Sequence, residues 1–398
     1  MQNVYIVAAQ RTAVTKANKG AFSQTRPDDL IAHAIKGTLA KTSIDPKLIE
    51  DVIIGCAMPE AEQGWNVARI AALMAGLPHQ VPGMTINRYC SSGVQSMAIA
   101  ADRIAAGQAD VMIAGGVESM SLVPMGGNKI AANPAWFEHN DQVAIAFGMG
   151  ITAEKVAERW KVSRQDQDAF SLLSHQRAVE AISKGYFNAE ILPFEITHHL
   201  PDLASGKIRE SKKVVAQDEG PRADTTLEAL AKLKPAFAAE GKGTVTDGNS
   251  SQMSDGAGVA VLVSERFLKQ HNLQPIARFC GSVVAGVAPE VMGIGPVEAI
   301  PRVLKQTGLS LAQIDWVELN EAFAAQSLAV IRDVQLDATK VNPLGGAIAL
   351  GHPLGGTGAI RVATLLHGLQ RVKKRYGMVT MCIGTGMGFA AVLENLMV

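Results

Sequence analysis

The sequence predicts an α/β fold organised around a mostly parallel β-sheet. Short aliphatic runs of strand length alternate with amphipathic stretches of helix length at both ends of the chain, a pattern typical of βαβ units. Hydrophobic residues make up 47% of the chain, aromatic residues only 5%, and 38 residues are glycine, which indicates a tightly packed enzyme. The length of 398 residues predicts two or three domains.

Residues 1–119, together with 250–272, are assigned to a first α/β half. The expected strands are Val4 to Ala8, Val52 to Cys56, a segment ending at Asn87, and Val111 to Ala114; the expected helices are Asp28 to Lys41, Asn66 to Met74, and Ser92 to Ala106. Strands joined through helices in this order predict right-handed crossovers.

Residues 120–249 have a different texture and predict an inserted domain that covers a pocket. They hold most of the proline and charge clusters, with one long helix that opens at Ser163 and has Asp166 in its first turn. The stretch THHLPDLASGKIRESKK, residues 197–213, is expected to be a loop.

Residues 273–398 form the second expected α/β half. Regular α/β texture returns at Gly256 to Ser264, which still belongs to the first half. The second half continues with Ala277 to Ala288, a helix after Pro296, the strand Trp316 to Leu319, a helix after Glu321, and the stretch Lys340 to Leu366. That last stretch reads as a short apolar strand, a glycine-dense loop and an Ala/Leu-rich helix. Lys41 to Gly55 and Gln306 to Asn320 share a helix-turn-strand pattern at an offset of 265, which favours two similar halves.

Charge and cysteine content narrow the class of protein. Lys plus Arg equals Asp plus Glu at 37 each, which argues against nucleic-acid binding. Four cysteines without a CxxC motif favour a reducing compartment, and the N-terminus lacks a signal-peptide pattern, so we expect a cytoplasmic protein. The uncharged run Tyr376 to Leu393 contains four glycines, so two buried strands explain it better than a membrane span.

Cys90 is the best candidate nucleophile in the sequence. It lies where a strand ends and a helix begins, so the first helical N–H groups should stabilise a thiolate and lower the thiol pKa. A buried, inert cysteine is the alternative. Cys382 lies between an apolar strand and a glycine turn whose amides can bind an oxyanion. Cys56 and Cys280 are expected to be structural.

His352 stands inside the glycine-dense loop. Six of the fourteen residues from Gly345 to Gly358 are glycine, so the backbone can approach another group closely. This loop predicts an active-site wall, and a tight connection with an incidental histidine is the alternative. Neither a P-loop nor a dinucleotide fingerprint is present, and no spaced ligand set predicts a metal site.

Asn320 and Glu321 follow a strand at the end where ligands bind in open parallel sheets. In the insertion, four basic residues near Phe237 and the segment TDGNSSQMSDGAG could seat a phosphate-bearing ligand, or could simply form a solvated surface; they are Arg222, Lys232, Lys234 and Lys242.

Together these residues resemble the thiolase family along essentially the whole chain. The matching motifs, in order, are NRYCSSG (87–93), GGVESMS (115–121), MGITAEKVAERW (149–160), GNSSQMSDGA (248–257), MGIGP (292–296), NEAFAAQ (320–326), NPLGGAIALGHPLGGTGA (342–359) and CIGTGMG (382–388). The degradative 3-ketoacyl-CoA thiolases fit best. The resemblance implies two βαβαβαββ halves in a five-layer αβαβα arrangement with an inserted loop domain.

The resemblance also implies roles for individual residues. Cys90 is the acyl-accepting nucleophile, His352 its base, and Cys382 the acid/base at the acetyl carbon. Asn320 would hold a water that forms one oxyanion hole with His352, and the amides of Cys90 and Gly384 would form the other. This set can cleave a carbon–carbon bond beside a ketone without a metal.

Coenzyme A is implied as a co-substrate, with no permanently bound cofactor. Its expected contacts are Ser251 beside the pantetheine, Phe237 along the chain and Arg222 at the adenine, with Met149 and Phe323 in the substrate site. Gly148 stands where the biosynthetic branch has His, which favours a roomier acyl pocket. Asp247 stands where a small residue is usual, beside the CoA segment.

Two other functions compete with thiolytic cleavage of 3-ketoacyl-CoA in fatty-acid β-oxidation. One is condensation of two acetyl-CoA units by a biosynthetic thiolase, and the other is a non-catalytic acyl or sterol carrier. A non-catalytic carrier would lack the Cys, His or Asn of the site, and none is missing. Ketoacyl synthases share the architecture but use a Cys-His-His set, whereas the second acid/base here is Cys382. The resemblance further implies a homodimer or a dimer of dimers that pairs through residues 84–87, while a hydratase/dehydrogenase partner is left open.

Overall fold

The structure is a computed structural model of the chain and describes residues 2–139, 142–238 and 242–398. Its centre is a ten-stranded sheet with the order β10-β11-β12-β9-β1-β8-β5-β3-β4, and β2 pairs with β8 beside this path. The sheet is mixed rather than mostly parallel, because only the β3–β4, β3–β5 and β10–β11 pairs are parallel. The strands that return at the end of each half, β8 and β12, run antiparallel to their neighbours.

The first half of the molecule agrees closely with the sequence pattern. Its elements are β1 (Val4–Arg11), β2 (Thr15–Lys16), α1 (Pro27–Leu39), β3 (Asp51–Gly55), α2 (Val67–Met74), β4 (Gly83–Ile86), α3 (Ser92–Ala105), β5 (Val111–Ser119), β8 (Ser254–Ser264) and α7 (Glu265–Gln270). The Asn66 side chain caps α2 by accepting from the Arg69 N–H at 3.4 Å.

The second half repeats this plan with fewer strands. Its elements are β9 (Ala277–Gly286), α8 (Gly295–Thr307), β10 (Trp316–Leu319), α9 (Ala324–Val334), α10 (Ala347–Leu350), α11 (Leu354–Val372), β11 (Tyr376–Ile383) and β12 (Met387–Asn395). The uncharged run near the C-terminus is the β11–β12 hairpin, as predicted. The short strand expected before the glycine-dense loop is only a single bridge between Val317 and Val341, and the loop itself holds α10.

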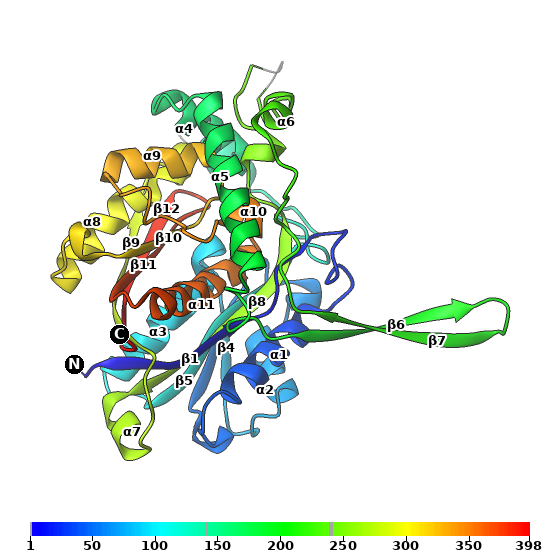
Figure 1. Cartoon of the computed structure of the whole chain (residues 1–398), viewed down its shortest axis with the longest axis vertical. Helices are drawn as coiled ribbons and strands as arrows, with labels where there is room; N and C mark the ends of the chain where they lie inside the picture. The colour runs from blue at the N-terminus through cyan, green and yellow to red at the C-terminus, as the bar shows by residue number, and fades with distance from the viewer. Residues whose placement is uncertain (1, 140–141, 239–241) are drawn as a thin grey trace.

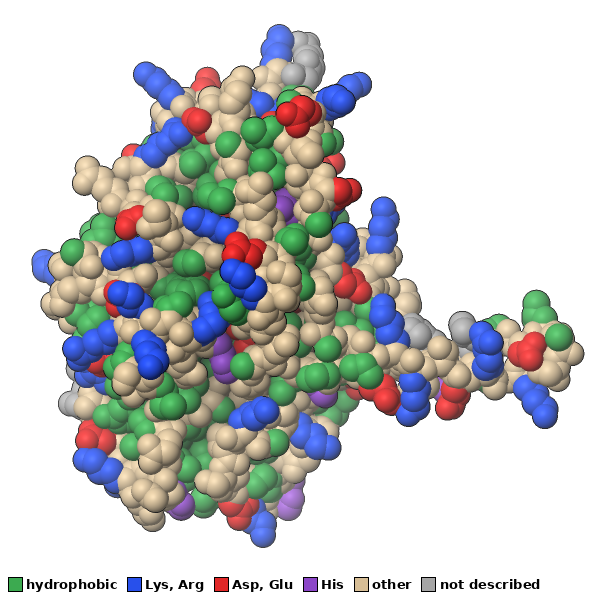
Figure 2. Space-filling view, in the orientation of Figure 1, with side chains coloured by type: hydrophobic (Ala, Val, Ile, Leu, Met, Phe, Trp, Pro, Cys, Tyr) green, Lys and Arg blue, Asp and Glu red, His purple; other side chains and the backbone are tan. Residues whose placement is uncertain are grey.

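The insertion contains α4 (Met149–Arg159), α5 (Arg164–Ser183), the strands β6 (Phe194–Asp202) and β7 (Lys207–Val215), and α6 (Leu227–Ala231). Ser163 caps α5 by accepting from the Asp166 N–H at 3.1 Å, as expected. The loop expected over residues 197–213 is wrong, because this stretch belongs to the β6–β7 hairpin that projects from the body (Figure 1). Lysine and arginine side chains line the projection in Figure 2.

Helices lie on both outer faces of the sheet and also between its two halves. α1 and α2 cover the strands of the first half, and α8 covers β9 and β12 of the second. α3 and α11 contact each other; α3 packs on β5, and α11 packs on β5, β8 and β11. This arrangement is the five-layer αβαβα order that the resemblance implies, and it buries α11 at the centre (Figure 1).

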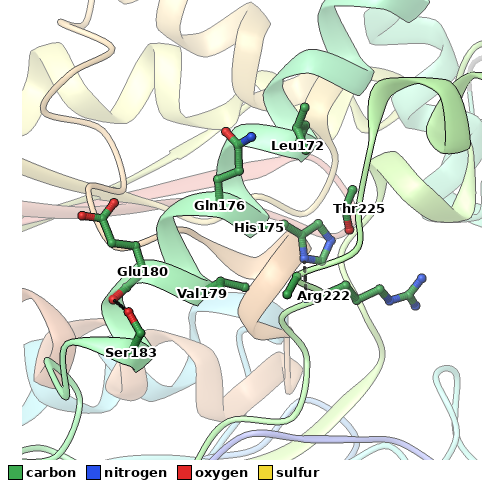
Figure 3. A pocket seen from close by; sticks show the side chains of 9 residues that line it. Leu172, His175, Gln176, Val179, Glu180, Ser183, Arg222 and Thr225 are labelled. Carbon is green, nitrogen blue, oxygen red and sulfur yellow. Dashed lines mark hydrogen bonds between the residues drawn. The ribbon is translucent and has the colours of Figure 1, made fainter.

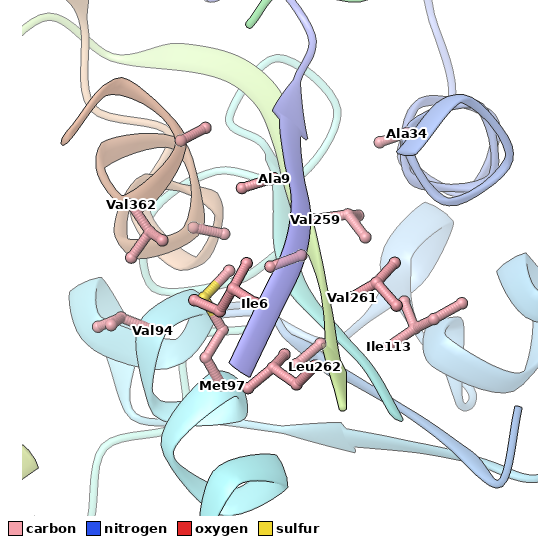
Figure 4. Packing of buried hydrophobic residues seen from close by; sticks show 14 of the residues in the cluster. Ile6, Ala9, Ala34, Val94, Met97, Ile113, Val259, Val261, Leu262 and Val362 are labelled. Atoms are coloured by element: carbon pink, nitrogen blue, oxygen red, sulfur yellow. The ribbon is translucent and has the colours of Figure 1, made fainter. Parts of the chain in front are cut away.

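The core is built from small aliphatic side chains rather than aromatic ones. Figure 4 shows Ile6, Val94, Met97, Leu262 and Val362 packed between α3, α11 and the sheet, and all five are fully buried. Small residues let the central helices approach closely: a Cβ on Gly93 of α3 would lie 2.7 Å from the Gly355 carbonyl oxygen of α11. Among the described residues, no helix is long and apolar enough to cross a bilayer.

Candidate active site

Cys90 lies in a single 3₁₀ turn, Tyr89–Ser91, between β4 and α3. Tyr89 has φ +43, an uncommon value for a non-glycine residue, and its N–H donates to Asn87 Oδ1 at 2.8 Å. The Asn87 amide in turn donates to the Ala57 carbonyl at 3.0 Å. The turn contacts both α11, which begins two residues after His352, and β11, which carries Cys382.

The pKa of Cys90 is raised to about 11, whereas the sequence suggested that it is lowered. Burial of the thiol is the largest cause, and hydrogen bonds from the Gly384 and Cys90 backbone N–H groups only partly oppose it. The helix-end effect is therefore present but weaker than desolvation. The nearby carboxylate of Glu118 adds to the increase.

His352 stands between α10 and α11, and its hydrogen bonds determine its tautomer. Nε2 lies 3.3 Å from Asn320 Nδ2, and Nδ1 lies 2.6 Å from Thr357 Oγ1. Because an amide nitrogen only donates, Nε2 accepts and Nδ1 carries the proton. Burial, followed by the positive charge of Arg361, lowers the His352 pKa to about 3. The imidazole is thus a neutral base.

Asn320 and Cys382 complete the centre of the site. Asn320 follows β10, and its Oδ1 atom is buried with no hydrogen-bond partner among the described residues. Cys382 is fully buried at the end of β11, and burial together with the Cys90 sulfur raises its pKa. The turn that holds Cys90 packs against β11, which carries Cys382, and the Gly384 backbone N–H is a hydrogen-bond donor to the Cys90 sulfur.

Two buried carboxylates, not assigned from the sequence, support these loops. Glu118 accepts from the N–H groups of Ala57, Met58 and Gly355 at 2.7, 3.0 and 2.9 Å. It therefore joins the loop after β3 to the first turn of α11. Its position in the GGVESMS motif at the end of a buried strand was the available signal.

Glu321 similarly supports the segments that lead to His352. It accepts from Ser174 Oγ at 2.7 Å, Asn342 Nδ2 at 2.8 Å and the Ile348 N–H at 3.2 Å. These contacts join α5, the glycine-dense loop and the loop after β10. Sequence analysis placed Glu321 at a ligand-binding strand end, but its partners lie in distant segments.

Apolar residues of the insertion and of the segment between β10 and α9 pack with Cys382. Met149 and Phe323 belong to the same hydrophobic cluster as Cys382. Phe237 meets Phe323 edge to face with ring centroids 6.1 Å apart, and a Cβ on Gly150 would collide with the Phe237 ring at 2.1 Å. Ser251 joins this wall because its N–H donates to the Ala322 carbonyl at 2.9 Å.

The basic residues are less clearly part of the site. Arg222 is exposed and lies in the irregular segment between β7 and α6. Its backbone N–H donates to His175 Nδ1 at 3.2 Å. Lys232, Lys234 and Lys242 are exposed, as is Asp247. The structure thus brings the apolar candidates together with the thiols and the imidazole, while the cations lie at the outer surface.

The chain matches two family models, "Thiolase, N-terminal domain" over residues 4–266 and "Thiolase, C-terminal domain" over residues 273–395. It is 50% identical over 395 residues to the 3-ketoacyl-CoA thiolase of Bacillus subtilis, covering 99% of this chain and 100% of the relative.

Two solved structures are also similar. One is an acetyl-CoA acetyltransferase of Bacillus anthracis, with a TM-score of 0.89, 39% identity, and coverage of 100% of this chain and 99% of the other. The other is the dimeric peroxisomal thiolase of Saccharomyces cerevisiae, with a TM-score of 0.86, 41% identity, and coverage of 99% and 97%.

Proposed function

Because this chain belongs to the thiolase family, we propose that it cleaves 3-ketoacyl-CoA with CoA, giving acetyl-CoA and a shortened acyl-CoA. The observation that carries the proposal is that the Cys90 turn packs against β11, which carries Cys382, while the neutral His352 imidazole lies 3.3 Å from the buried Asn320 amide. Full-length similarity at 50% identity to a 3-ketoacyl-CoA thiolase favours the degradative direction over condensation. The chain is therefore an acyltransferase that uses CoA as a co-substrate.

Acylation begins at Cys90. His352 Nε2 takes the thiol proton while the sulfur attacks the ketone carbonyl, because a thiol with a pKa near 11 needs a base at neutral pH. The carbonyl oxygen becomes an oxyanion, which the N–H groups of Cys90 and Gly384 would stabilise. Both groups are hydrogen-bond donors to the Cys90 sulfur, beside which the oxyanion forms.

Cleavage follows when the oxyanion collapses and the bond between the ketone carbon and the acetyl carbon breaks. The electron pair leaves with the acetyl-CoA fragment as an enolate, and Cys382 donates the proton that converts it to acetyl-CoA. A water held by Asn320 and the protonated Nε2 of His352, which lies 3.3 Å from the Asn320 amide, would be the donors for the enolate oxygen. CoA then gives its thiol proton to the Cys382 thiolate and attacks the acyl-Cys90 thioester, and Cys90 leaves as a thiolate that takes its proton back from the protonated His352.

Gly148 bears on the length of the acyl chain that the enzyme accepts. A Cβ on Gly148 would meet no atom within 4 Å, and the residue directly precedes Met149 beside Cys382. Because Gly148 is exposed, this space opens to solvent, and the missing side chain beside Met149 supports use of 3-ketoacyl chains longer than acetoacetyl. Phe237, Phe323 and Ser251 are the proposed wall for the pantetheine arm, and Arg222 the proposed contact for the nucleotide end.

A homodimer is the proposed assembly. The yeast relative at 41% identity is described as dimeric, and β4 forms one edge of the sheet with a 40% exposed Met84. The Cys90 turn begins three residues after β4, so pairing of two chains at this edge would also stabilise the turn that carries the nucleophile.

The test is CoA-dependent cleavage of a graded 3-ketoacyl-CoA series by the parent chain, Cys90→Ser and Gly148→His. The parent should cleave long chains at least as fast as acetoacetyl-CoA, and Gly148→His should lose long-chain rate selectively because the imidazole fills the open space. Cys90→Ser should lose activity by several orders of magnitude and show no acyl adduct by intact mass. A parent that condenses acetyl-CoA but cleaves only acetoacetyl-CoA would establish the biosynthetic alternative.

A further inference from the structure

Residues 220–222, which lead to Arg222, are held from one side by Gln252. Its Nε2 donates to the carbonyl oxygens of Gly220 and Ile348 at 3.0 Å each and of Ala349 at 3.2 Å. The backbone is packed closely here, since a Cβ on Gly220 would lie 2.2 Å from the Ala349 oxygen. One side chain therefore joins the segment before Arg222 to α10, directly before the catalytic imidazole.

The main chain of Gln252 extends this link to the site itself. Its carbonyl accepts from the His352 N–H at 3.0 Å, and Ser251 is its chain neighbour. A displacement of residues 220–222 would thus act on the backbone that carries His352. The hydrogen bonds of Gln252 therefore hold both the segment before the proposed CoA contact and the backbone of His352.

His175 holds the same segment from the other side. It lies on α5, is only 5% exposed, and its Nδ1 accepts from the Arg222 N–H at 3.2 Å (Figure 3). A backbone N–H only donates, so Nδ1 is unprotonated and the proton is on Nε2. Burial and the positive charges of Arg222 and Lys16, partly opposed by Asp224, lower the His175 pKa to about 4. The acceptor is therefore retained at neutral pH.

Close packing is not what keeps Arg222 against α5. A cavity of about 320 Å³ lies between the helix and residues 222–225, with Leu172, Gln176 and Val179 on its helical wall. Where a gap separates two segments, a directed hydrogen bond decides their relative position. His175 supplies that bond at the residue from which the guanidinium extends.

We propose that His175 and Gln252 are positioning residues for coenzyme A. Together they fix residues 220–222, so that Arg222 presents its guanidinium to the anionic nucleotide end of CoA while His352 keeps its place. The inference rests on the proposed function, because the contact between Arg222 and CoA belongs to it. The side chains themselves touch the protein backbone and not the reacting atoms.

Two substitutions of His175 separate positioning from general stability. His175→Phe retains a ring but leaves the Arg222 N–H without its acceptor, whereas His175→Asn places Oδ1 where Nδ1 was. We expect His175→Phe to raise the KM and Kd for CoA about five- to tenfold, which follows from the cost of an unsatisfied N–H, with kcat within twofold. His175→Asn should stay within twofold of the parent in all three.

Gln252→Leu and Gln176→Ala complete the set. Gln252→Leu removes the donor to the carbonyl groups of Gly220, before Arg222, and of Ile348 and Ala349, before His352. It should therefore raise the KM for CoA and also lower kcat. Gln176→Ala alters the same cavity wall and leaves both links in place, so it should match the parent. Kd is measured by calorimetry with CoA alone, and melting temperature reports folding.

Equal KM values for His175→Phe and the parent, or equal losses in His175→Phe and His175→Asn, would overturn the inference. If His175→Phe does not fold, Gln252→Leu with unchanged KM and kcat would overturn it as well. A parent chain that binds CoA but cleaves no 3-ketoacyl-CoA would refute the proposed function instead, and the Kd comparison would still decide the positioning roles.

Discussion

The position of one proton decides how the Cys90 thiol reacts. Burial raises its pKa to about 11 and lowers that of His352 to about 3, so the proton stays on sulfur in the resting enzyme. A preformed thiolate–imidazolium pair would require the opposite order of pKa values. We infer that deprotonation accompanies attack on the substrate carbonyl, when the oxyanion donors stabilise the new charge.

This order predicts the pH dependence of Cys90 alkylation. Because the folded-state pKa is raised, the thiolate fraction should increase about tenfold per pH unit through neutrality and level off only near pH 11. The measurement is the rate of iodoacetamide labelling of the Cys90 peptide, followed by mass spectrometry across pH 6 to about 10. A plateau between pH 6 and 8 would demonstrate an ion pair and contradict the assignment.

Which residues the sequence reveals depends on where their partners lie. Cys90, His352, Cys382 and Asn320 stand at strand ends or in glycine loops, and such local context is visible in a one-dimensional pattern. Glu118 accepts from Gly355, which is 237 residues away, and this partner depends on packing of α11 against α3. Its supporting role could not be predicted without the fold, and neither could a thiol pKa set by burial.

Among elements, the β6–β7 hairpin is the longest of those that the sequence pattern does not predict. Strand prediction relies on alternation between a buried and an exposed face, but most of this hairpin is exposed on both faces, as the unbroken run of exposed residues 207–214 in β7 shows. Pro201 within β6 added a further signal against a strand. The buried strands and amphipathic helices around the site were predicted to within a few residues because the core imposes their period.

The insertion is fastened to β1 by a buried ion cluster. Arg11 is 1% exposed and donates to Glu190 at 2.6 Å and to Asp218 at 2.8 and 2.9 Å, and Thr364 of α11 also donates to Glu190. Both carboxylates flank the inserted hairpin in the chain. The cluster therefore couples the segment that leads to the proposed CoA contact with the first half of the fold.

Removing the cation should strongly destabilise the protein. Arg11→Met leaves two buried carboxylates without their charge partner, and we expect a loss of about 3–5 kcal/mol in the free energy of unfolding. Arg26→Met is the matched control, since Arg26 pairs with Asp28 while 53% exposed and should cost at most about 1 kcal/mol. Denaturant titration of both variants compares them. Equal midpoints would show that the cluster contributes nothing.

At the scale of the molecule, the two sheet edges differ in how they meet solvent. β10 ends one side of the sheet and is buried along its length, whereas β4 ends the other and is half exposed. Exposed apolar side chains lie on and near β4, with Met74 at 48%, Met84 at 40% and Trp65 at 97%. An unpaired, partly apolar edge is a ready site for a second chain.

We therefore expect a homodimer that forms through β4 and supports the Cys90 turn. Met84→Lys combined with Met74→Lys places two charges on this surface, which should shift the sedimentation mass from about twice 42.0 kDa toward 42.0 kDa. Cleavage activity should fall with the dimer, because the turn that holds the nucleophile begins three residues beyond β4. Leu203→Lys is the control, since Leu203 is 93% exposed at the hairpin tip, far along the chain from this edge. A stable and fully active monomer in the double variant, or dissociation caused by Leu203→Lys instead, would place the interface elsewhere and remove β4 from the account of the active site.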